Sequence, residues 1–237
     1  MNFLITGTTG IAQAAADMAR SRGDRVFTIG LEDTADFQAD LRDEAQTEAA
    51  VAAAATAMDG RIDGLFNVAG MSGRRFGDGP LDECTLDAFR ATIEANAVTV
   101  FLINRAIIRH WLARSEKGAI VNLGSVLIEY PEPAHFATHA YGAAKGGVIA
   151  MTRAAASYYA PKGIRMNIIA PGLVRTPMTA RAQTDPVIMD FMARKQPLSN
   201  GILDADDIAS AALFLLGKES KHITGQVLSV DGGWSLS

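Results

Sequence analysis

The residues that most directly suggest chemistry are Tyr141 and Lys145. They stand four positions apart in the stretch Tyr-Gly-Ala-Ala-Lys. Residues with this spacing share one face of a helix. A tyrosine titrates near pH ~10, which is too high for an efficient base at neutral pH. An ammonium group beside a phenol favours the phenolate, so we expect Lys145 to lower the pKa of Tyr141. Ser125, upstream of the pair, is the third candidate.

A glycine-rich turn near the start of the chain is a candidate phosphate site. The segment 6–12 reads Thr-Gly-Thr-Thr-Gly-Ile-Ala and lies between the first expected strand and the first expected helix. Gly7 permits a tight turn, and Gly10 lets an anion approach the free N–H groups at the helix N-terminus. The order of strand, turn and helix predicts a dinucleotide site. The alternative is an ordinary strand–helix turn with two glycines.

The residues after the second expected strand bear on the choice of dinucleotide. Segment 29–33 reads Ile-Gly-Leu-Glu-Asp, and an acid here would bind a ribose 2′-hydroxyl and repel a 2′-phosphate. No lysine or arginine occurs between Val26 and Leu41, which favours NAD over NADP. Counted along the chain, however, the position expected for this acid is taken by Leu31 or by the glycine before it, so Glu32 could point elsewhere. The alternative is that Glu32 and the next acid are solvated loop residues.

Two further segments are candidates for cofactor contacts. Asp40 could lie beside an adenine amine, or it could cap the helix expected to begin near Arg42. In the segment Asn-Val-Ala-Gly at 67–70, Gly70 would allow close approach of the cofactor. Asn67 could bind the cofactor or only tie neighbouring strands together.

The elements that must position these residues alternate between short β-branched runs and alanine-rich stretches. This alternation predicts one α/β domain over residues 1–237, with a Rossmann-type, doubly wound parallel sheet of about seven strands and helices on both faces. The expected strands are Asn2–Thr6, Arg25–Ile29, Gly64–Val68, Ala119–Leu123, Arg165–Ile169 and Gln226–Val230. The expected helices are Ile11–Arg22, Arg42–Met58, Leu86–Arg114, Ala140–Ala160 and Ala205–Leu216.

Two long connections, 126–140 and 175–201, should form substrate walls at the carboxyl edge of the sheet. Their histidines and acids suggest a polar substrate such as a polyol, a sugar or a hydroxylated ring. Two histidines without a supporting acid or thiol at ligand spacing predict no metal site. The candidate pocket residues are Val126, Leu127, Glu129, His135, Phe136, Gly172 and Met178, with Arg74 and Arg75 just past Gly70.

Composition limits the class of protein. A net charge of −4 predicts no broad basic surface for nucleic acid. We expect no signal peptide and no apolar stretch long enough to span a bilayer. The single cysteine, Cys84, cannot form an internal disulfide, which is in keeping with a cytoplasmic location.

Taken in order, these motifs resemble the short-chain dehydrogenase/reductase family over essentially the whole chain. The resemblance implies an NAD(P)-dependent enzyme that interconverts a secondary alcohol and a ketone, and a homotetramer. The alanine-rich faces of the two long expected helices, Leu86–Arg114 and Ala140–Ala160, would suit close helix packing between subunits. Tyr141 would be the general acid/base, Lys145 would hold the nicotinamide ribose, and Ser125 would polarise the substrate oxygen. The remaining matches are Thr6-Gly7, Gly10, Asp40, Asn67 to Gly70, Asn96, Pro171 to Thr176, Ile223 to Gly225 and Val230 to Gly233.

The resemblance also implies that Asn96 supports a water linking Lys145 to solvent, while the glycine-rich C-terminus could dock on a neighbouring subunit. The expected cofactor contacts are Gly7, Thr9, Gly10, Ile11, Leu31, Glu32, Asp40, Leu41, Asn67, Ala69, Gly70, Tyr141, Lys145, Pro171, Gly172, Val174 and Thr176. The expected substrate contacts are Ser125, Leu127, His135, Tyr141, Gly172 and Met178.

Two departures from the family pattern stand out. The glycine turn is one residue shorter, with Ala12 in place of its last glycine, and the interval from Ser125 to Tyr141 is a few residues longer. We expect a small polar or cyclic alcohol as substrate, with NAD. One alternative is an NADPH-dependent carbonyl or 3-oxoacyl-type reductase. Another is a nucleotide-binding regulator without turnover, which would have no need to keep the three catalytic residue types.

Overall fold

The β-branched runs form one seven-stranded sheet in the computed structural model, which describes residues 1–237. All neighbouring strands are parallel, in the order β3-β2-β1-β4-β5-β6-β7. This confirms the expected doubly wound sheet. The strand that was not expected is β3, because two residues are too few to show a period. The strands are β1 (Asn2–Thr6), β2 (Arg25–Gly30), β3 (Phe37–Gln38), β4 (Gly64–Asn67), β5 (Gly118–Leu123), β6 (Ile164–Pro171) and β7 (Val227–Val230).

The long helices form where the alanine-rich stretches predict them. The helix that begins later than expected is α2, because Asp43 caps it by accepting the backbone N–H of Gln46. The interpretation of Asp40 as the cap of this helix is therefore wrong. The expected helix 86–114 contains a π-helical segment, Glu94–Val98. The long helices are α1 (Ile11–Ser21), α2 (Glu44–Ala57), α3 (Leu86–Ile93), α4 (Thr99–Ala113), α6 (His139–Tyr159) and α9 (Ala205–Leu216).

Three shorter helices lie in the two segments that we expected to be loops. They are α5 (Pro133–Phe136), α7 (Ala180–Thr184) and α8 (Pro186–Lys195). Pro133 and Pro186 are the first residues of their helices. Proline is well tolerated there, because its missing N–H has no helical partner at that position. The prolines that suggested loops therefore start helices instead.

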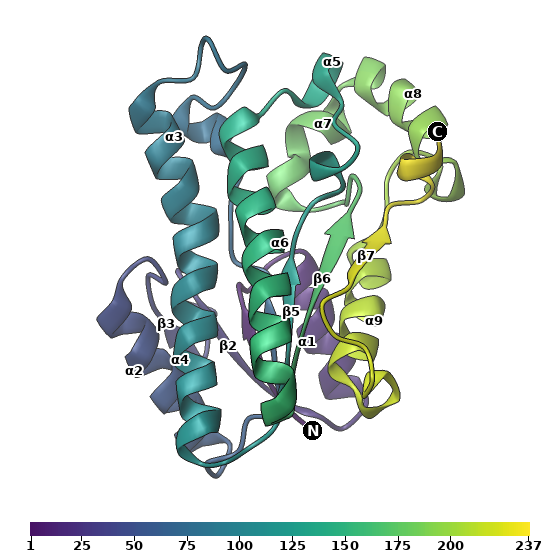
Figure 1. The fold of residues 1–237 in the computed structure, drawn as a ribbon. Coiled ribbons are helices and arrows are strands. Elements are labelled where there is room, and N and C mark those ends of the chain that lie inside the picture. The colour runs from purple at the N-terminus through teal and green to yellow at the C-terminus, as the bar shows by residue number, and fades with distance from the viewer.

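The sheet is the middle of three layers. Ile5, Phe66 and Val121 pack with α1 and α9 in a cluster of 19 buried residues. Leu65 and Ile120 point to the opposite face and pack with α2 and α4 in a second cluster of 19. In Figure 1, α4 and α6 lie in front of the sheet and α1 lies behind it. The strands read as continuous apolar runs because successive side chains alternate between two buried faces.

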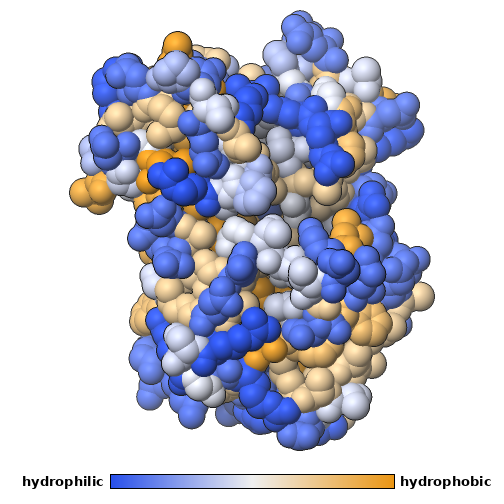
Figure 2. Space-filling view, turned by 180° about the vertical axis from the view of Figure 1, so that it is seen from behind, coloured by the Kyte–Doolittle hydropathy of each residue, from blue (hydrophilic) through white to orange (hydrophobic).

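The parallel strands bring their carboxyl ends to one edge of the sheet. The strand order reverses between β1 and β4, so the switch point where such folds bind ligands lies at this edge. Beyond the carboxyl ends of β6 and β7 lie α5, α7 and α8 (Figure 1). Seen from behind, the surface is mostly hydrophilic, with paler residues across its middle (Figure 2).

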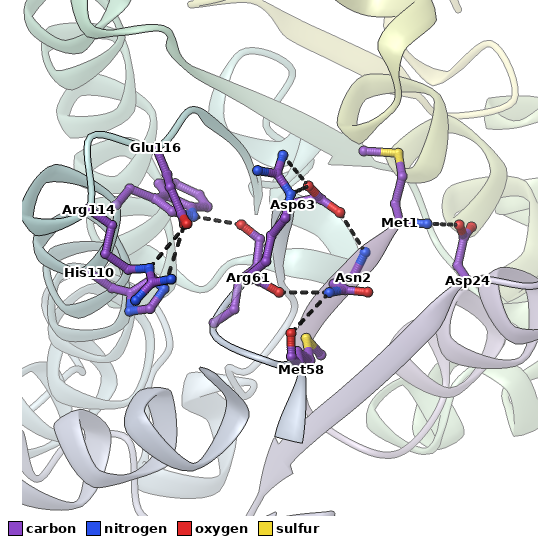
Figure 3. Close-up of polar contacts among 11 residues, drawn as sticks. Met1, Asn2, Asp24, Met58, Arg61, Asp63, His110, Arg114 and Glu116 are labelled. Carbon is purple, nitrogen blue, oxygen red and sulfur yellow. Dashed lines mark hydrogen bonds and ion pairs between the residues drawn. The ribbon is translucent and has the colours of Figure 1, made fainter. Parts of the chain in front are cut away.

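Polar contacts fasten the opposite edge, where the strands begin (Figure 3). The backbone N–H of Asn2 donates to Asp63 Oδ2 at 2.8 Å, and its side-chain Nδ2 donates to the carbonyl oxygen of Arg61 at 2.8 Å. The ammonium of Met1 pairs with Asp24 at 2.6 Å. These contacts join the starts of β1, β2 and β4, so we assign them a structural role.

The helical stretch Leu86–Ala113 is long and apolar enough, by length and composition alone, to cross a membrane, which we did not expect from the sequence. Its most apolar window has a mean hydropathy of 1.3, and 61% of that window is buried inside the molecule. Ile103, Ile107 and Trp111 of this stretch are fully buried. A buried core helix passes the same test, so the stretch carries no argument for a membrane.

Candidate active site

The helix that carries the tyrosine and the lysine is anchored by a carboxylate from a distant loop. The residue before α6, Thr138, makes no side-chain cap. Instead, Asp78 accepts the backbone N–H groups of Ala140 and Tyr141, each at 2.9 Å. Asp78 is itself buried. Sequence reasoning missed it because nothing near Asp78 in the chain marks it as the cap of a helix so far away.

Replacing Asp78 by asparagine should lower kcat about tenfold, because an amide N–H would face one of the two backbone N–H groups and shift the first turn of α6. The loss of a hydrogen bond to a charged group is worth about 1.5–3 kcal/mol. The measurement is kcat and KM of the catalysed reaction, with Asp82→Asn in the exposed loop as the matched control. A lower melting temperature with an unchanged kcat would show that Asp78 only stabilises the fold.

Lys145 lies beneath the site and is almost fully buried. Its Nζ donates to the carbonyl oxygen of Leu123 at 2.7 Å and lies 5.7 Å from the centroid of the Tyr141 ring. Burial lowers the pKa of Lys145 to about 8. The structure thus places the two side chains together on one face of α6.

The lowering of the Tyr141 pKa that we expected from Lys145 is not found in the protein alone. Burial raises the pKa of Tyr141 to about 12, and a hydrogen bond with Ser125 opposes this shift only in part. The ammonium of Lys145 donates to Leu123 rather than to the phenol. The phenol therefore needs a further positive charge nearby before it can serve as a base at neutral pH.

Ser125 follows the end of β5 in extended conformation and caps a 3₁₀ turn, Val126–Ile128. Its Oγ accepts the backbone N–H of Leu127 at 3.3 Å. The side chain is mostly buried and lies beside Tyr141, with which it shares the hydrogen bond described above. The longer interval between the two residues therefore does not separate them.

Asn96 occupies the π-helical segment and is fully buried. Its Nδ2 donates to the carbonyl oxygens of Met71 and Thr92 at 3.0 and 2.9 Å, and its Oδ1 accepts the N–H of Met71 at 3.1 Å. A Cβ on Gly70 would lie 2.7 Å from Asn96 Oδ1 and 3.6 Å from Lys145 Nζ. Asn96 thus holds the turn after β4 next to the lysine. The water that it is expected to support remains a prediction.

A cavity of about 450 Å³ runs along the carboxyl edge from the glycine turn to the segment after β6. Gly7 and Gly10 have φ values of +94° and +54°, which favour glycine. No side chain caps α1. The N–H of Ala12 donates to the carbonyl oxygen of Thr9 at 3.2 Å, whereas those of Ile11 and Gln13 remain open to an anion. A Cβ on Gly10 would lie 2.9 Å from Thr176 Cγ2, so a side chain there would strike the opposite wall. These features fit an extended dinucleotide.

Most of the expected cofactor residues line this one cavity. They are Gly7, Thr9, Gly10, Ile11, Leu31, Glu32, Asp40, Leu41, Ala69, Gly70, Tyr141, Pro171, Gly172, Val174 and Thr176. Lys145 is buried behind the wall. Asn67 is not in the wall either, because its Oδ1 accepts from Thr6 Oγ1 at 2.8 Å and its Nδ2 donates to Asn122 Oδ1 at 3.4 Å. The prediction of Asn67 as a cofactor contact is corrected to a tie between strands.

The acid after β2 folds back toward the glycine turn. Glu32 Oε2 accepts from Thr8 Oγ1 at 3.0 Å, and it would lie 2.7 Å from a Cβ on Gly30. Glu32 therefore lines the cavity at its mouth, where its side chain is also exposed to solvent. Asp40 also lines the cavity, but its carboxylate is held by the Arg42 guanidinium at 2.6 Å, and this bond lowers the pKa of Asp40.

Two arginines in the cavity wall were missed as candidate phosphate contacts. Arg42 stands just beyond the stretch without cations, and Arg75 comes from the turn after β4. Arg42 is paired with Asp40, whereas the guanidinium of Arg75 lies 5.7 Å from the centroid of the Phe76 ring. Arg42 and Arg75 lie in different loops and share no sequence motif, so only the folded structure shows that they line the same cavity.

A second, smaller cavity of about 150 Å³ opens beside the first. The residues that line both cavities are Ser125, Tyr141, Pro171, Gly172, Met178 and Thr179. Tyr141 and Ser125 therefore stand where the two cavities meet. Of the other expected pocket residues, Val126, Leu127 and Phe136 line the smaller cavity.

Comparison with known proteins gives a consistent result. A sequence profile described as Enoyl-(Acyl carrier protein) reductase matches residues 5–235. The 2,5-dichloro-2,5-cyclohexadiene-1,4-diol dehydrogenase of Sphingobium indicum is 34% identical over 233 residues, which are 96% of this chain and 88% of that protein. The chain belongs to the short-chain dehydrogenase/reductase family. It is an NAD(P)-dependent oxidoreductase of this family's alcohol dehydrogenase type.

Two solved structures show the same fold over the full chain. ElxO with NADP bound is 27% identical with a TM-score of 0.87, and 4-hydroxyisoleucine dehydrogenase complexed with NADH is 25% identical with a TM-score of 0.87. Each comparison covers 100% of this chain and 99% of the other.

Two expectations for the substrate wall of this dehydrogenase need correction. Neither His135 nor Glu129 lines the smaller cavity. The ring of His135 packs instead against Phe191, with 4.9 Å between ring centroids, because α5 turns it toward α8. The extra residues between Ser125 and Tyr141 thus include a small helix, from which Phe136 lines the cavity and His135 packs against α8.

The C-terminal segment of the dehydrogenase completes its own pocket, although we expected that it could dock on a neighbour. Trp234 is buried, lines the smaller cavity and donates from Nε1 to the carbonyl oxygen of Tyr130 at 3.1 Å. Its ring lies 5.6 Å from that of Phe136. A lone tryptophan near the end of a chain carries no sequence signal for a pocket. Sequence reasoning also missed Ser72, Thr138, Leu173, Thr179, Arg181 and Ala182 in this wall.

Proposed function

We propose that the enzyme oxidises a small cyclic or polar secondary alcohol to a ketone with NAD. The observation that carries this proposal is the position of Tyr141 and Ser125 at the junction of the two cavities. A substrate hydroxyl between these groups would lie next to the nicotinamide end of the larger cavity. The pocket volume of about 150 Å³ favours a compact substrate. The cyclic diol in the name of the Sphingobium relative supports the cyclic class.

In this mechanism, Tyr141 takes the proton from the substrate hydroxyl and Ser125 donates a hydrogen bond to the developing alkoxide. A bound oxidised nicotinamide supplies the hydride acceptor and a positive charge. That charge favours the phenolate, which the protein alone does not achieve. Lys145 would hold the cofactor ribose, while the N-terminus of α1 would hold its phosphates.

The test of this function is turnover of NAD⁺ with cyclohexanol, cyclohexane-1,2-diol and 2-butanol, followed by the absorbance of NADH. Oxidation of at least one of these alcohols is the expected result. Binding of NADH without any turnover of alcohols or of the matching ketones would favour the nucleotide-binding regulator instead. Turnover of the ketones with NADPH alone would favour the carbonyl reductase.

The preference for NAD rests on Glu32. Its carboxylate faces the cavity beside Thr8, where it could bind a ribose diol and would repel a 2′-phosphate. NADP remains the second candidate because Arg75 lines the same cavity and forms a contact only with an aromatic ring. The names of the two similar structures include both NADP and NADH, so the family alone does not decide the cofactor.

Replacement of Glu32 by arginine should shift the ratio of kcat/KM for NADP to that for NAD upward by about tenfold or more. The change removes a repulsive charge and adds a phosphate-binding one. The ratio is measured by steady-state kinetics with both cofactors, alongside titrations with NADH and NADPH. Asp33→Arg is the matched control, because Asp33 makes the same charge change outside the cavity wall. An equal shift in both variants would mean that net charge, not position, causes the effect.

We further propose that residues 1–237 form one catalytic domain that assembles as a homotetramer in the cytoplasm. Exposed apolar side chains on neighbouring helices support assembly, namely Phe89, Phe101, Leu112 and Tyr158. The single free cysteine supports a reducing compartment. Light scattering after size exclusion tests the assembly, and a monomer would contradict it.

A further inference from the structure

Two arginines stand together in the wall of the smaller cavity. Arg74 comes from the turn after β4, and Arg181 comes from α7. Their Nη2 atoms both donate to the carbonyl oxygen of His135, at 3.0 Å from Arg74 and 3.2 Å from Arg181. The two guanidinium groups therefore approach one another around a single oxygen atom. Each has further N–H donors left over.

Neither arginine of this pair forms an ion pair. Several other arginines of the chain form ion pairs, such as Arg194 with Asp190 at 2.6 Å, whereas Arg74 and Arg181 form none. Burial, followed by the charge of Arg181, lowers the pKa of Arg74, and Asp78 opposes this only in part. The carboxylate of Asp78 is already occupied by two backbone N–H groups. Both side chains are exposed, so water screens part of their mutual repulsion, and an anion between them would remove the rest.

The residues around Arg74 and Arg181 also favour an anionic ligand. No acidic side chain lines the smaller cavity, although the chain as a whole carries a net charge of −4. Ser72 and Thr138 add neutral polar groups to the wall, and Leu127 and Phe136 add apolar surface. The same pocket thus presents cations, an apolar body and the Tyr141–Ser125 pair.

We propose that Arg74 and Arg181 bind an anionic group of the substrate, so that the enzyme acts on a secondary alcohol that carries a carboxylate, sulfonate or phosphate. This inference rests on the proposed alcohol oxidation at Tyr141. Arginine suits the role because its planar fork makes two hydrogen bonds to such an anion. The apolar wall would contact the carbon skeleton between the anionic group and the reacting hydroxyl.

Binding of cyclohexanecarboxylate and of its uncharged isostere cyclohexanecarboxamide tests the proposal. The probes have the same shape, and calorimetry on the NADH complex measures their affinities without turnover. We expect the wild-type protein to bind the carboxylate at least about tenfold more tightly than the amide. Arg74→Gln combined with Arg181→Gln should bring the two affinities together, and Arg181→Lys should restore part of the difference. Arg194→Gln, outside the pocket, should leave the ratio unchanged.

A purely structural role for the pair makes a different prediction. If the arginines only fasten α5 through the His135 carbonyl, the double variant should lose stability and bind both probes equally less well, so that the affinity ratio stays the same. That result would overturn the proposal, as would a wild-type protein that does not favour the carboxylate. Melting temperature and NADH affinity verify that each variant is folded. Competition by methanesulfonate and methyl phosphate then identifies the anion that the arginines prefer.

Turnover separates this inference from the proposed function. The matched substrates are 3-hydroxycyclohexanecarboxylate and 3-hydroxycyclohexanecarboxamide with NAD⁺. A higher kcat/KM for the acid, lost in the double variant mainly through KM, supports both proposals. Equal turnover of acid and amide leaves the alcohol dehydrogenase intact and overturns the anion site. Arginine-dependent binding of the carboxylate without any turnover overturns the proposed function and leaves the anion site intact.

Discussion

Tyr141→Phe is expected to lower kcat for alcohol oxidation by about 10²- to 10⁴-fold, the range that a general base contributes. The substitution removes one oxygen and keeps the ring, which packs at the junction of the two cavities. Ser125 remains and can still bind the substrate oxygen, but it has no group to which the proton can pass. NADH affinity should change little, because most of the cavity wall is untouched. Steady-state kinetics and a fluorescence titration with NADH measure the two quantities.

The matched control for this variant is Tyr158→Phe. Tyr158 lies on the same helix and loses the same oxygen, but its side chain is exposed and lines neither cavity. It should retain the wild-type kcat. Retained activity in Tyr141→Phe would show that another group takes the proton, and the assignment of the base would then fail.

Lys145→Met is expected to reduce kcat by about 10²-fold or more and to weaken NAD binding about tenfold. Methionine has a similar length and apolar stem, so it can fill the buried space that Lys145 occupies. It lacks the charge beside the phenol and the donor expected to bind the nicotinamide ribose. Rate and affinity should therefore fall together, in contrast to Tyr141→Phe. An unchanged KM for NAD would contradict the ribose contact.

Lys162→Met is the control for Lys145→Met, because Lys162 is exposed and lies over the rings of Tyr158 and Tyr159 rather than in the site. It should keep the wild-type rate. A similar loss in both variants would point to a general effect of lysine removal.

The same variant tests the buried charge through the pH dependence of stability. Burial lowers the pKa of Lys145 from 10.5 to about 8, so between these values the folded protein has released a proton that the unfolded chain keeps. The unfolded state binds more protons in this window, and stability therefore rises with pH from about 8 toward 10.5. Lys145→Met should lose this contribution to the rise. Denaturant titrations of both proteins without cofactor measure it, and identical pH profiles would mean that the lysine is not buried as described.

The structural features that the sequence predicted correctly are those set by residues close together in the chain. The pairing of Tyr141 with Lys145 depends only on helix periodicity. The conformation of Gly7 and Gly10 depends on the absence of a Cβ, and both have positive φ. The strands β1, β4 and β5 are continuous apolar runs because both of their faces are covered. These properties are carried by neighbouring residues, so the amino-acid sequence by itself determined the sheet, the conformation of the glycine turn and the placement of Tyr141 and Lys145 on one helix face.

Other parts of the site depend on residues that meet only after folding. Asp78 caps α6 from a distant loop, and Trp234 closes the substrate pocket from the end of the chain. The pKa of Tyr141 moved upward, against expectation, because burial outweighs its polar neighbours. Arg74 and Arg181 meet at one carbonyl oxygen although many residues separate them in the chain. Burial and long-range contact have no local period, so only the tertiary structure decided the electrostatics of the site and the charge of the pocket.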